Sequence, residues 1–291
     1  MKRTMAQLLW RAGLAGPAFA LRQFSWRFKA STLYQSARYA LNGAPDGQPM
    51  PATWARVRVA GSPDPDWFFR SGALAAQSIR AAVGRQTRDL SACERILDFG
   101  CGCGRVLRHW HNLRGVQVYG TDFQVPLLAE CHRSLPFVRL AANAPEPPLP
   151  FADASFDLIY CLSVFTHFDE QQDLLWRNEI QRLLKPGGLW VFSVQGSAYL
   201  DKLSRSEREA FQAGCLVCQR SDFRGLNLCM TYHPETHVRR VLSQGFSVLD
   251  AVPQGALGNP PQDLYVLQRD PMHVGVAPYA SDHRPLAILR Q

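Results

Sequence analysis

The chain has 291 residues, 46% of them hydrophobic and 19% charged, which excludes a disordered chain and a coiled coil. No uninterrupted apolar run reaches the roughly eighteen residues that a membrane-spanning helix needs. The net charge is +8, but seven basic and no acidic residues precede Pro45, which leaves only +1 for the remainder. A nearly neutral remainder argues against a basic groove, so we expect no nucleic-acid partner.

The basic N-terminal segment mixes cations with Leu, Trp and Phe side chains. Leu21, Phe24 and Phe28 fall at helical spacing, which predicts an amphipathic helix. One interpretation is peripheral contact of residues 1–41 with an anionic membrane surface. A second is a helix packed on its own domain or on another subunit. A third is a signal peptide that ends near Ala18-Phe19-Ala20.

The next segments predict a linker and then a layered α/β unit. A Pro- and Gly-rich stretch at 42–51 reads as the linker, and a helical pattern follows to about Gly84. From Glu94 onward, strand-like apolar runs alternate with helical stretches, which indicates a parallel sheet covered on both faces. The predicted strands are 95–99, 116–119, 137–140, 156–162, 189–194, 246–249 and 263–268. The predicted helices are 105–110, 126–133, a helix from N-cap Asp169 to a stop at 185–188, 207–213 and 234–242. The last two strands form a hairpin, so one of them must run antiparallel.

The turn after the first of these strands is the most informative segment. Asp98 ends the strand, and Gly100, Gly102 and Gly104 allow the backbone to approach a ligand closely. We expect the helix that follows to present free N–H groups to a polar or anionic group. A second acid, Asp122, ends the next strand, where doubly wound folds bind ribose hydroxyls. The third glycine comes one residue earlier than in the dinucleotide fingerprint, which argues against a nicotinamide cofactor.

These segments resemble the class I S-adenosylmethionine-dependent methyltransferases. The resemblance covers residues 94–268 and rests on five motifs: LDFGCGCG at 97–104, GTD at 120–122, PLPFADASFD at 148–157, SVFTH at 163–167 and RLLKPGG at 182–188. It implies a Rossmann-like, seven-stranded, mostly parallel sheet with one antiparallel strand in a C-terminal hairpin and helices on both faces. We therefore expect a basic helical extension or cap at 1–84, a methyltransferase domain at 85–270 and an irregular tail at 271–291.

The resemblance also implies that the cofactor is S-adenosyl-L-methionine. Gly100 to Gly104 would line its methionine end, Asp122 would take both ribose hydroxyls, and Phe123 would lie against the adenine. Asn143, where many relatives carry an Asp, would lie near the exocyclic amine. The complete set of expected cofactor-binding residues is Asp98, Phe99, Gly100, Cys101, Gly102, Gly104, Asp122, Phe123, Asn143, Ala144 and Ser163.

Two histidines are candidate bases for a methyl acceptor. A hydroxyl acceptor benefits from a group that takes its proton. His167 follows the fourth predicted strand and His233 precedes a helix; for each, the alternative is an ordinary structural hydrogen bond. We expect methyl transfer, through oxygen, to a small molecule, a sugar or a lipid-linked glycan. The rival functions are an NAD(P)-dependent oxidoreductase and a membrane-associated protein that binds S-adenosylmethionine without catalysis.

The eight cysteines, several of them inside apolar runs, are typical of a reducing compartment, so we expect a cytoplasmic protein. Cys215, Cys218 and Cys229 with His233 and His237 have a spacing that could hold zinc, and ordinary thiols are the alternative. Because methyl transfer needs no metal, we expect none.

Two further motifs are not among the five that carry the resemblance. Trp67, Phe68 and Phe69 precede the glycine turn, and we expect this cluster to help close the cofactor cleft; a plain core role is the alternative. Asn259-Pro-Pro-Gln262 is similar to a motif of amino-methylating nucleic-acid enzymes. It precedes the last strand instead of following the fourth, so we assign it no such role.

Overall fold

The structure is a computed structural model that describes residues 30–86, 88–219 and 229–271. The amphipathic helix predicted around Leu21 to Phe28, the alternative signal peptide and nearly all of the tail lie outside these residues. Among the helices that are described, none is long and apolar enough to cross a membrane.

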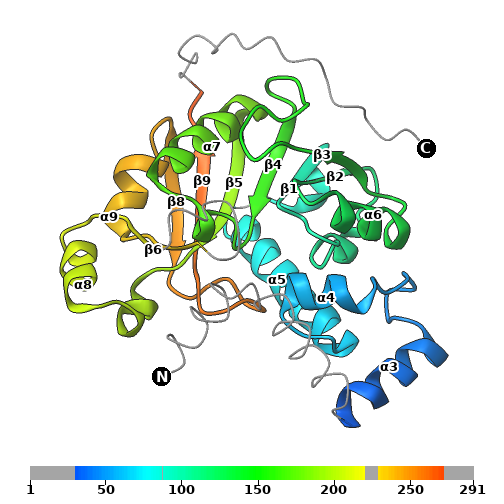
Figure 1. The fold of residues 1–291 in the computed structure, drawn as a ribbon. Helices are drawn as coiled ribbons and strands as arrows, with labels where there is room; N and C mark the ends of the chain where they lie inside the picture. The colour runs from blue at the N-terminus through cyan, green and yellow to red at the C-terminus, as the bar shows by residue number, and fades with distance from the viewer. Residues whose placement is uncertain (1–29, 87, 220–228, 272–291) are drawn as a thin grey trace.

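A seven-stranded sheet forms the centre of the molecule (Figure 1). Its strands are β1 (Arg95–Phe99), β2 (Gln117–Asp122), β3 (Arg139–Ala142), β4 (Phe156–Cys161), β5 (Leu184–Val194), β8 (Phe246–Val252) and β9 (Asp263–Arg269). The order across the sheet is β3-β2-β1-β4-β5-β9-β8. Strand β9 pairs antiparallel with both β5 and β8, and the other pairs are parallel. The predicted fold class, including the antiparallel strand of the closing hairpin, is confirmed.

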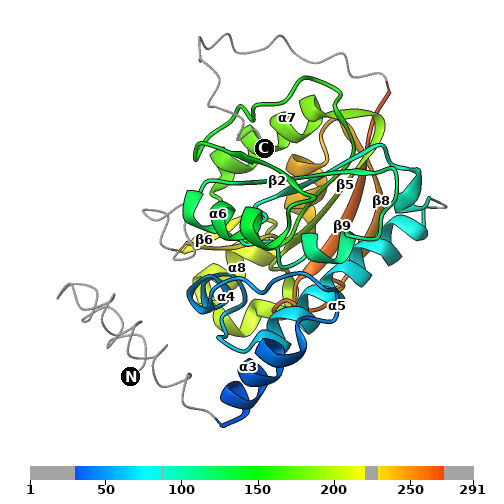
Figure 2. The same cartoon turned by 90° about the vertical axis from the view of Figure 1, so that its right-hand side faces the viewer.

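Alternating side chains of the strands pack into two separate hydrophobic cores, one on each face of the sheet. Ile96 and Leu158 pack in one cluster with residues of helix α5 (Pro65–Gly84) and α6 (Val125–Ser134). Leu97 and Ile159 point the other way and pack with residues of α7 (Glu170–Leu183). Figure 2 shows α5 and α7 on opposite sides of the sheet. Both faces are apolar because side chains alternate across a strand and each face is covered by helices.

Helix α5 is part of this core, although it lies in the segment 1–84 that the sequence assigns to an extension. It begins at Pro65, with the Asp64 side chain accepting a hydrogen bond from the Asp66 N–H. Its buried Ala75 and Ile79 pack against the sheet. A boundary at residue 84 therefore separates a helix from the core that it covers.

The remaining helical elements are α3 (Ala30–Asn42), α4 (Thr53–Ala60), α8 (Arg205–Gln212), α9 (Glu235–His237), a π-helical turn (Val238–Leu242) and short 3-10 turns at Leu90–Ala92, Leu107–Trp110, Phe165–His167 and Ser197–Lys202. Asp169 caps α7 through the Gln172 N–H, as predicted. A small antiparallel pair, β6 (Val217–Gln219) and β7 (Met230–Tyr232), lies outside the main sheet.

The local structure differs from the predictions at 105–110 and at 53–60. The helix predicted at 105–110 is only the 3-10 turn Leu107–Trp110. The predicted stop at 185–188 is confirmed, because α7 ends at Leu183, and the segment itself belongs to β5. Helix α4 lies between the predicted linker and helix, and its short sequence of alternating arginines and apolar residues gave no helical period.

The segment before the domain is fixed to it by buried polar contacts. Arg108 donates from Nε and Nη2 to both carboxylate oxygens of Asp46 at 2.7 and 2.9 Å, and both side chains are almost fully buried. The Ala52 N–H donates to Glu130 of α6 at 2.7 Å. These contacts place α4 beside the glycine turn, where its Val59 packs near Cys103.

Candidate cofactor and acceptor site

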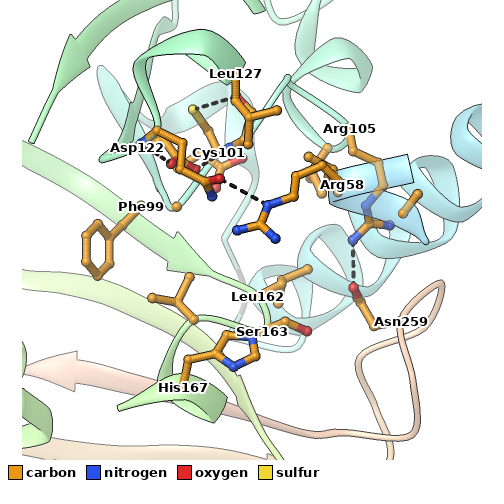
Figure 3. A pocket seen from close by; sticks show the side chains of 18 of the residues that line it. Arg58, Phe99, Cys101, Arg105, Asp122, Leu127, Leu162, Ser163, His167 and Asn259 are labelled. Carbon is orange, nitrogen blue, oxygen red and sulfur yellow. Dashed lines mark hydrogen bonds between the residues drawn. The ribbon is translucent and has the colours of Figure 1, made fainter. Parts of the chain in front are cut away.

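A cavity of about 760 Å³ lies at the carboxyl ends of β1, β2 and β4 (Figure 3). Its wall combines α4, the start of α5, the glycine turn, the segments that follow β2, β3 and β4, and the loop between β8 and β9. Open α/β sheets bind ligands at this edge.

Most of the predicted site residues lie in this wall. They are Asp98, Phe99, Gly100, Cys101, Gly102, Asp122, Phe123, Asn143, Ser163 and His167. Gly104, Ala144 and His233 were also predicted to bind or react with a ligand, but they do not line the cavity. Gly104 is turned into the protein, where an added Cβ would lie 2.4 Å from a methyl carbon of Leu135.

The backbone donors of the glycine turn are used within the protein. The N–H groups of Gly100 and Cys101 both donate to the Thr121 carbonyl, at 2.8 and 2.9 Å. The Gly102 N–H donates to Asp122 Oδ2 at 2.9 Å. These three donors hold the turn against the end of β2 and are not available to a ligand.

Two features require glycine in this turn: the positive φ angles of the backbone and the neighbouring side chains that pack against it. Gly102 has φ +56°, and an added Cβ would lie 2.8 Å from a methyl carbon of Val59. Gly100 has φ +81°, and its Cβ would meet Val164 at 2.5 Å. The absence of side chains lets α4 and the segment after β4 close on the turn.

Asp122 is held rigidly at the end of β2. Its Oδ1 accepts from the Gln124 N–H at 2.8 Å and its Oδ2 from the Gly102 N–H. Burial raises its pKa above the ordinary value, while the two backbone donors and the nearby Arg58 cation act in the opposite direction. The lone pairs that remain on the carboxylate are available to hydroxyl groups of a ligand.

Asp98 occupies a drier position in the same wall. The Tyr160 hydroxyl donates to Asp98 Oδ2 at 2.9 Å, and Trp110 Nε1 donates to the Tyr160 oxygen at 2.7 Å. Burial raises the pKa of Asp98 to about 7, although the Tyr160 hydrogen bond and the Arg105 charge favour its ionised form. A cationic group of a ligand would therefore find a carboxyl that can ionise on binding.

Asn143 follows β3 with one polar atom unused. Its Nδ2 donates to the Ala144 carbonyl at 2.7 Å. Its Oδ1 is buried and has no hydrogen-bond partner among the described residues. Since an unpaired buried acceptor is costly, a donor from a ligand would stabilise it. Phe123, also in the wall, is more than one third exposed and offers a flat apolar surface.

His167 is the histidine that lines the cavity. Its Nδ1 lies 2.7 Å from the Cys229 carbonyl oxygen, so Nδ1 carries the proton and Nε2 carries the lone pair. None of the described residues hydrogen-bonds to Nε2. Burial lowers the pKa of His167 below its ordinary value, which keeps the ring neutral near pH 7.

His233 has a structural position instead. It is fully buried, with Nε2 3.0 Å from Asp173 Oδ2, which also lies 3.2 Å from His237 Nε2. Burial lowers the pKa of His233 to about 3 and raises that of Asp173 to about 7. The two histidines thus tie the segment after β7 to α7.

The alternative zinc site is not assembled in the part of the chain that the structure describes. No group of three His, Cys, Asp or Glu side chains is arranged there to hold a metal ion. His233 and His237 face Asp173, and the Sγ atoms of Cys218 and Cys229 contact each other at 3.3 Å.

The three aromatic residues at 67–69 do not share one role: one lines the cavity and the other two pack in the protein. Trp67 lines the cavity, is about half exposed and donates from Nε1 to the Ala60 carbonyl at 3.2 Å. Phe68 is fully buried in the core, so the cleft-closing role is wrong for this residue. Phe69 packs edge-on against His109 outside the cavity wall.

Among the wall residues that were not predicted from the sequence are Arg58, Arg105 and Asn259. Arg58 reaches in from α4, and Arg105 donates to the Gly258 carbonyl at 3.2 Å and to Asn259 Oδ1 at 2.6 Å. Asn259 belongs to the Asn-Pro-Pro segment that was assigned no role. Arg58 and Asn259 come from segments distant in sequence, which no local pattern signals, whereas Arg105 directly follows the glycine turn. Ser163 was predicted, but its hydroxyl donates to Gln262 at 2.8 Å.

Comparisons with known proteins agree with this geometry. Residues 97–192 match the family model described as a methyltransferase domain. A solved S-adenosylmethionine-dependent methyltransferase from Mesorhizobium loti has the same fold, with a TM-score of 0.51 at 19% identity over 67% of this chain and 100% of that chain. The segment 97–192 is thus similar to a methyltransferase domain, and the chain shares the fold of that enzyme. The enzyme from Mesorhizobium loti is named as dependent on S-adenosylmethionine.

Curated relatives of this methyltransferase domain match part of their own length. A malonyl-[acyl-carrier protein] O-methyltransferase of Enterobacter lignolyticus is 32% identical over 39% of this chain and 44% of its own. The O-methyltransferase resE of Aspergillus sclerotiorum is 33% identical over 38% of this chain and 46% of its own. The chain therefore spans about half the length of these relatives.

Proposed function

We propose that the chain transfers a methyl group from S-adenosylmethionine to an oxygen atom of a small molecule, a sugar or a lipid-linked glycan. The observation that carries this proposal is the neutral His167 in the cavity wall, with its Nε2 lone pair free of partners among the described residues. Two relatives named as O-methyltransferases support oxygen as the acceptor atom.

The residues present fit this cofactor. The unpartnered Asn143 Oδ1 suits the exocyclic amine of adenine, and Phe123 offers an apolar surface for the ring. The fixed Asp122 carboxylate suits two ribose hydroxyls, each of which donates one hydrogen bond. Asp98, which can ionise near pH 7, suits the ammonium group of the methionine end. Gly100 and Gly102 line the cavity next to Asp98, on the side proposed for that end.

The protein's own contribution is orientation and proton transfer. The bound cofactor supplies a methyl group already activated on a sulfonium, so the residues mainly hold two reactants in line. His167 Nε2 accepts the proton of the acceptor hydroxyl, and the Cys229 carbonyl stabilises the charged ring by accepting from Nδ1–H. Trp67 and Leu162 in the wall keep bulk water from the reacting groups.

The rival functions have less support. A dinucleotide needs free backbone donors for its pyrophosphate, and in this turn the N–H groups of Gly100, Cys101 and Gly102 are already bonded within the protein. A protein that only binds the cofactor has no need of a neutral, oriented histidine in the same cavity.

The test is a comparison of His167→Ala with the surface variant His132→Ala. Incubation with S-adenosylmethionine and a cell extract should yield a methylated product, detected by mass spectrometry, with the wild type and with His132→Ala. We expect His167→Ala to lose about two orders of magnitude in rate while retaining cofactor affinity. Full activity of His167→Ala would remove its role as base, and tighter binding of NAD than of S-adenosylmethionine would favour the oxidoreductase.

A further inference from the structure

Arg58 is a cation in the cavity wall with most of its hydrogen-bonding groups unused. Its Nε donates to Gln124 Oε1 at 3.0 Å. Its two terminal NH₂ groups have no hydrogen-bond or ion-pair partner among the described residues. Figure 3 shows the guanidinium in the space between Asp122 and His167.

The neighbouring arginines, in contrast to Arg58, use their guanidinium groups in contacts within the protein. Arg56, two residues away on the same helix, donates to the carbonyls of Pro51 and Pro63. Arg105 binds the β8–β9 loop, and Arg108 forms the bidentate pair with Asp46. These three guanidinium groups are committed to the fold, whereas that of Arg58 faces the cavity.

The surroundings of Arg58 favour an anionic ligand. Its positive charge acts on both walls of the cavity, because it opposes the rise in the pKa of Asp122 and contributes to the low pKa of His167. A guanidinium in a partly apolar cavity gains most from a planar anion that accepts two parallel hydrogen bonds. A carboxylate has that geometry.

We infer that Arg58 binds a carboxylate inside the cavity, and that this carboxylate belongs to the amino-acid end of the cofactor. The inference rests on the proposed function. The residue next to Arg58, Val59, packs on Gly102 of the turn, so α4 lies over the part of the cavity assigned to the methionine end. Asp98, which also lines the cavity, suits the ammonium group of the same zwitterion.

The cavity contains residues from outside the segment that matches the family model. The family-model match begins at residue 97, so Arg58 lies outside the matched segment. Helix α4 therefore adds Arg58 to a binding site whose glycine turn, Asp98 and Asp122 lie inside the matched segment. The buried Asp46–Arg108 pair and the Ala52–Glu130 contact hold that helix in place.

The test compares two adenosine ligands that differ in the carboxylate. S-adenosylhomocysteine carries the amino-acid end, whereas 5′-methylthioadenosine lacks it. By calorimetric titration, Arg58→Gln should bind S-adenosylhomocysteine about tenfold or more weakly than wild type, with little change for 5′-methylthioadenosine. Arg70→Gln, a change at an exposed arginine of α5, is the matched control, and melting curves show whether each variant is folded.

The other outcomes are decisive as well. In a second outcome, Arg58→Gln binds both adenosine ligands as the wild type does, but malonate binds the S-adenosylhomocysteine-loaded wild type and not the loaded variant. That result would show a carboxylate site that serves the acceptor, and it would overturn the assignment to the cofactor. An equal loss for both adenosine ligands, or no change with any of the three, overturns the inference. If the wild type binds neither adenosine ligand, the proposed function fails, and the cofactor assignment of Arg58 fails with it.

Discussion

Asp98 and Asp122 have different chemical states although they share one cavity wall. Asp122 is surrounded by backbone donors, which fix its carboxylate in position. Asp98 receives one hydroxyl donor and is otherwise desolvated, so burial raises its pKa to about 7. The same side chain thus serves as a rigid acceptor in one place and as a group that ionises on binding in the other.

Replacing Asp122 by alanine should weaken S-adenosylmethionine binding at least tenfold. The change removes the acceptor of two ribose hydrogen bonds, each worth about 1.5–3 kcal/mol when the acceptor is charged. It also removes the acceptor that holds the Gly102 N–H. Calorimetric titration measures the affinity and a melting curve shows whether the fold survives. Unchanged affinity in a folded variant would place the ribose elsewhere.

The affinity for S-adenosylmethionine should rise between about pH 6 and pH 8. The pKa of Asp98 is about 7 in the free protein, and a cationic group binds the ionised carboxylate, so a proton is released on binding below that pKa. The affinity then changes by up to about tenfold per pH unit and levels off above the pKa. Titrations of the wild type and Asp98→Asn at several pH values check this. The asparagine variant should show a flat profile; an equal slope in both proteins would assign the effect to another group.

Helix α5 shows how one element serves both stability and the site. Its first turn places Trp67 in the cavity wall and Phe68 in the core between α4 and α6. Adjacent residues on a helix point in directions about 100° apart, so a run of aromatics cannot all face one cavity.

The two aromatics should therefore give opposite results when changed separately. Trp67→Ala should weaken binding of the cofactor or acceptor with little effect on the melting temperature, because its ring is about half exposed. Phe68→Ala should destabilise the protein by about 3–5 kcal/mol, as expected for a fully buried phenylalanine. Thermal melts beside binding titrations decide the matter. A large loss of stability in Trp67→Ala, with unaltered affinity, would give it a purely structural role.

At the scale of the whole molecule, the excess positive charge and the cavity lie in different parts of the sequence. Most of the net positive charge lies before Pro45, whereas the cavity is built from residues after that point. Within the described residues, α3 meets the domain through Tyr39, whose hydroxyl donates to Asp66 at 3.4 Å. Ligand binding and any contact made by the basic segment can therefore be tested independently.

Deleting residues 1–41 should leave the affinity for S-adenosylmethionine unchanged, because no cavity residue is removed. Co-sedimentation with vesicles that contain anionic lipid should be lost if this segment contacts membranes, because its cations and apolar side chains are removed. The deletion of residues 1–29 alone separates the contribution of α3. A tenfold loss of cofactor affinity on deletion to residue 41 would show that the segment supports the cavity.

Much of the site could be predicted from the sequence because its signals are local. The glycines of the turn, Asp98 and Asp122 at strand ends, and the position of His167 after β4 all follow from short-range patterns. His167 and His233 could not be separated in this way. Their roles depend on the Cys229 carbonyl beside one and the buried Asp173 beside the other, and these partners lie about sixty residues away in sequence.

The sequence by itself determined the sheet, its closing hairpin and the residues at the strand ends, because alternation and glycine turns are properties of neighbouring residues. Only the tertiary structure decided which segments close the cavity. Helix α4 brings Arg58 and the β8–β9 loop brings Asn259 through buried contacts between segments far apart in the chain. Such contacts depend on how whole elements pack, so the physical information that places them is not contained in any single stretch of the sequence.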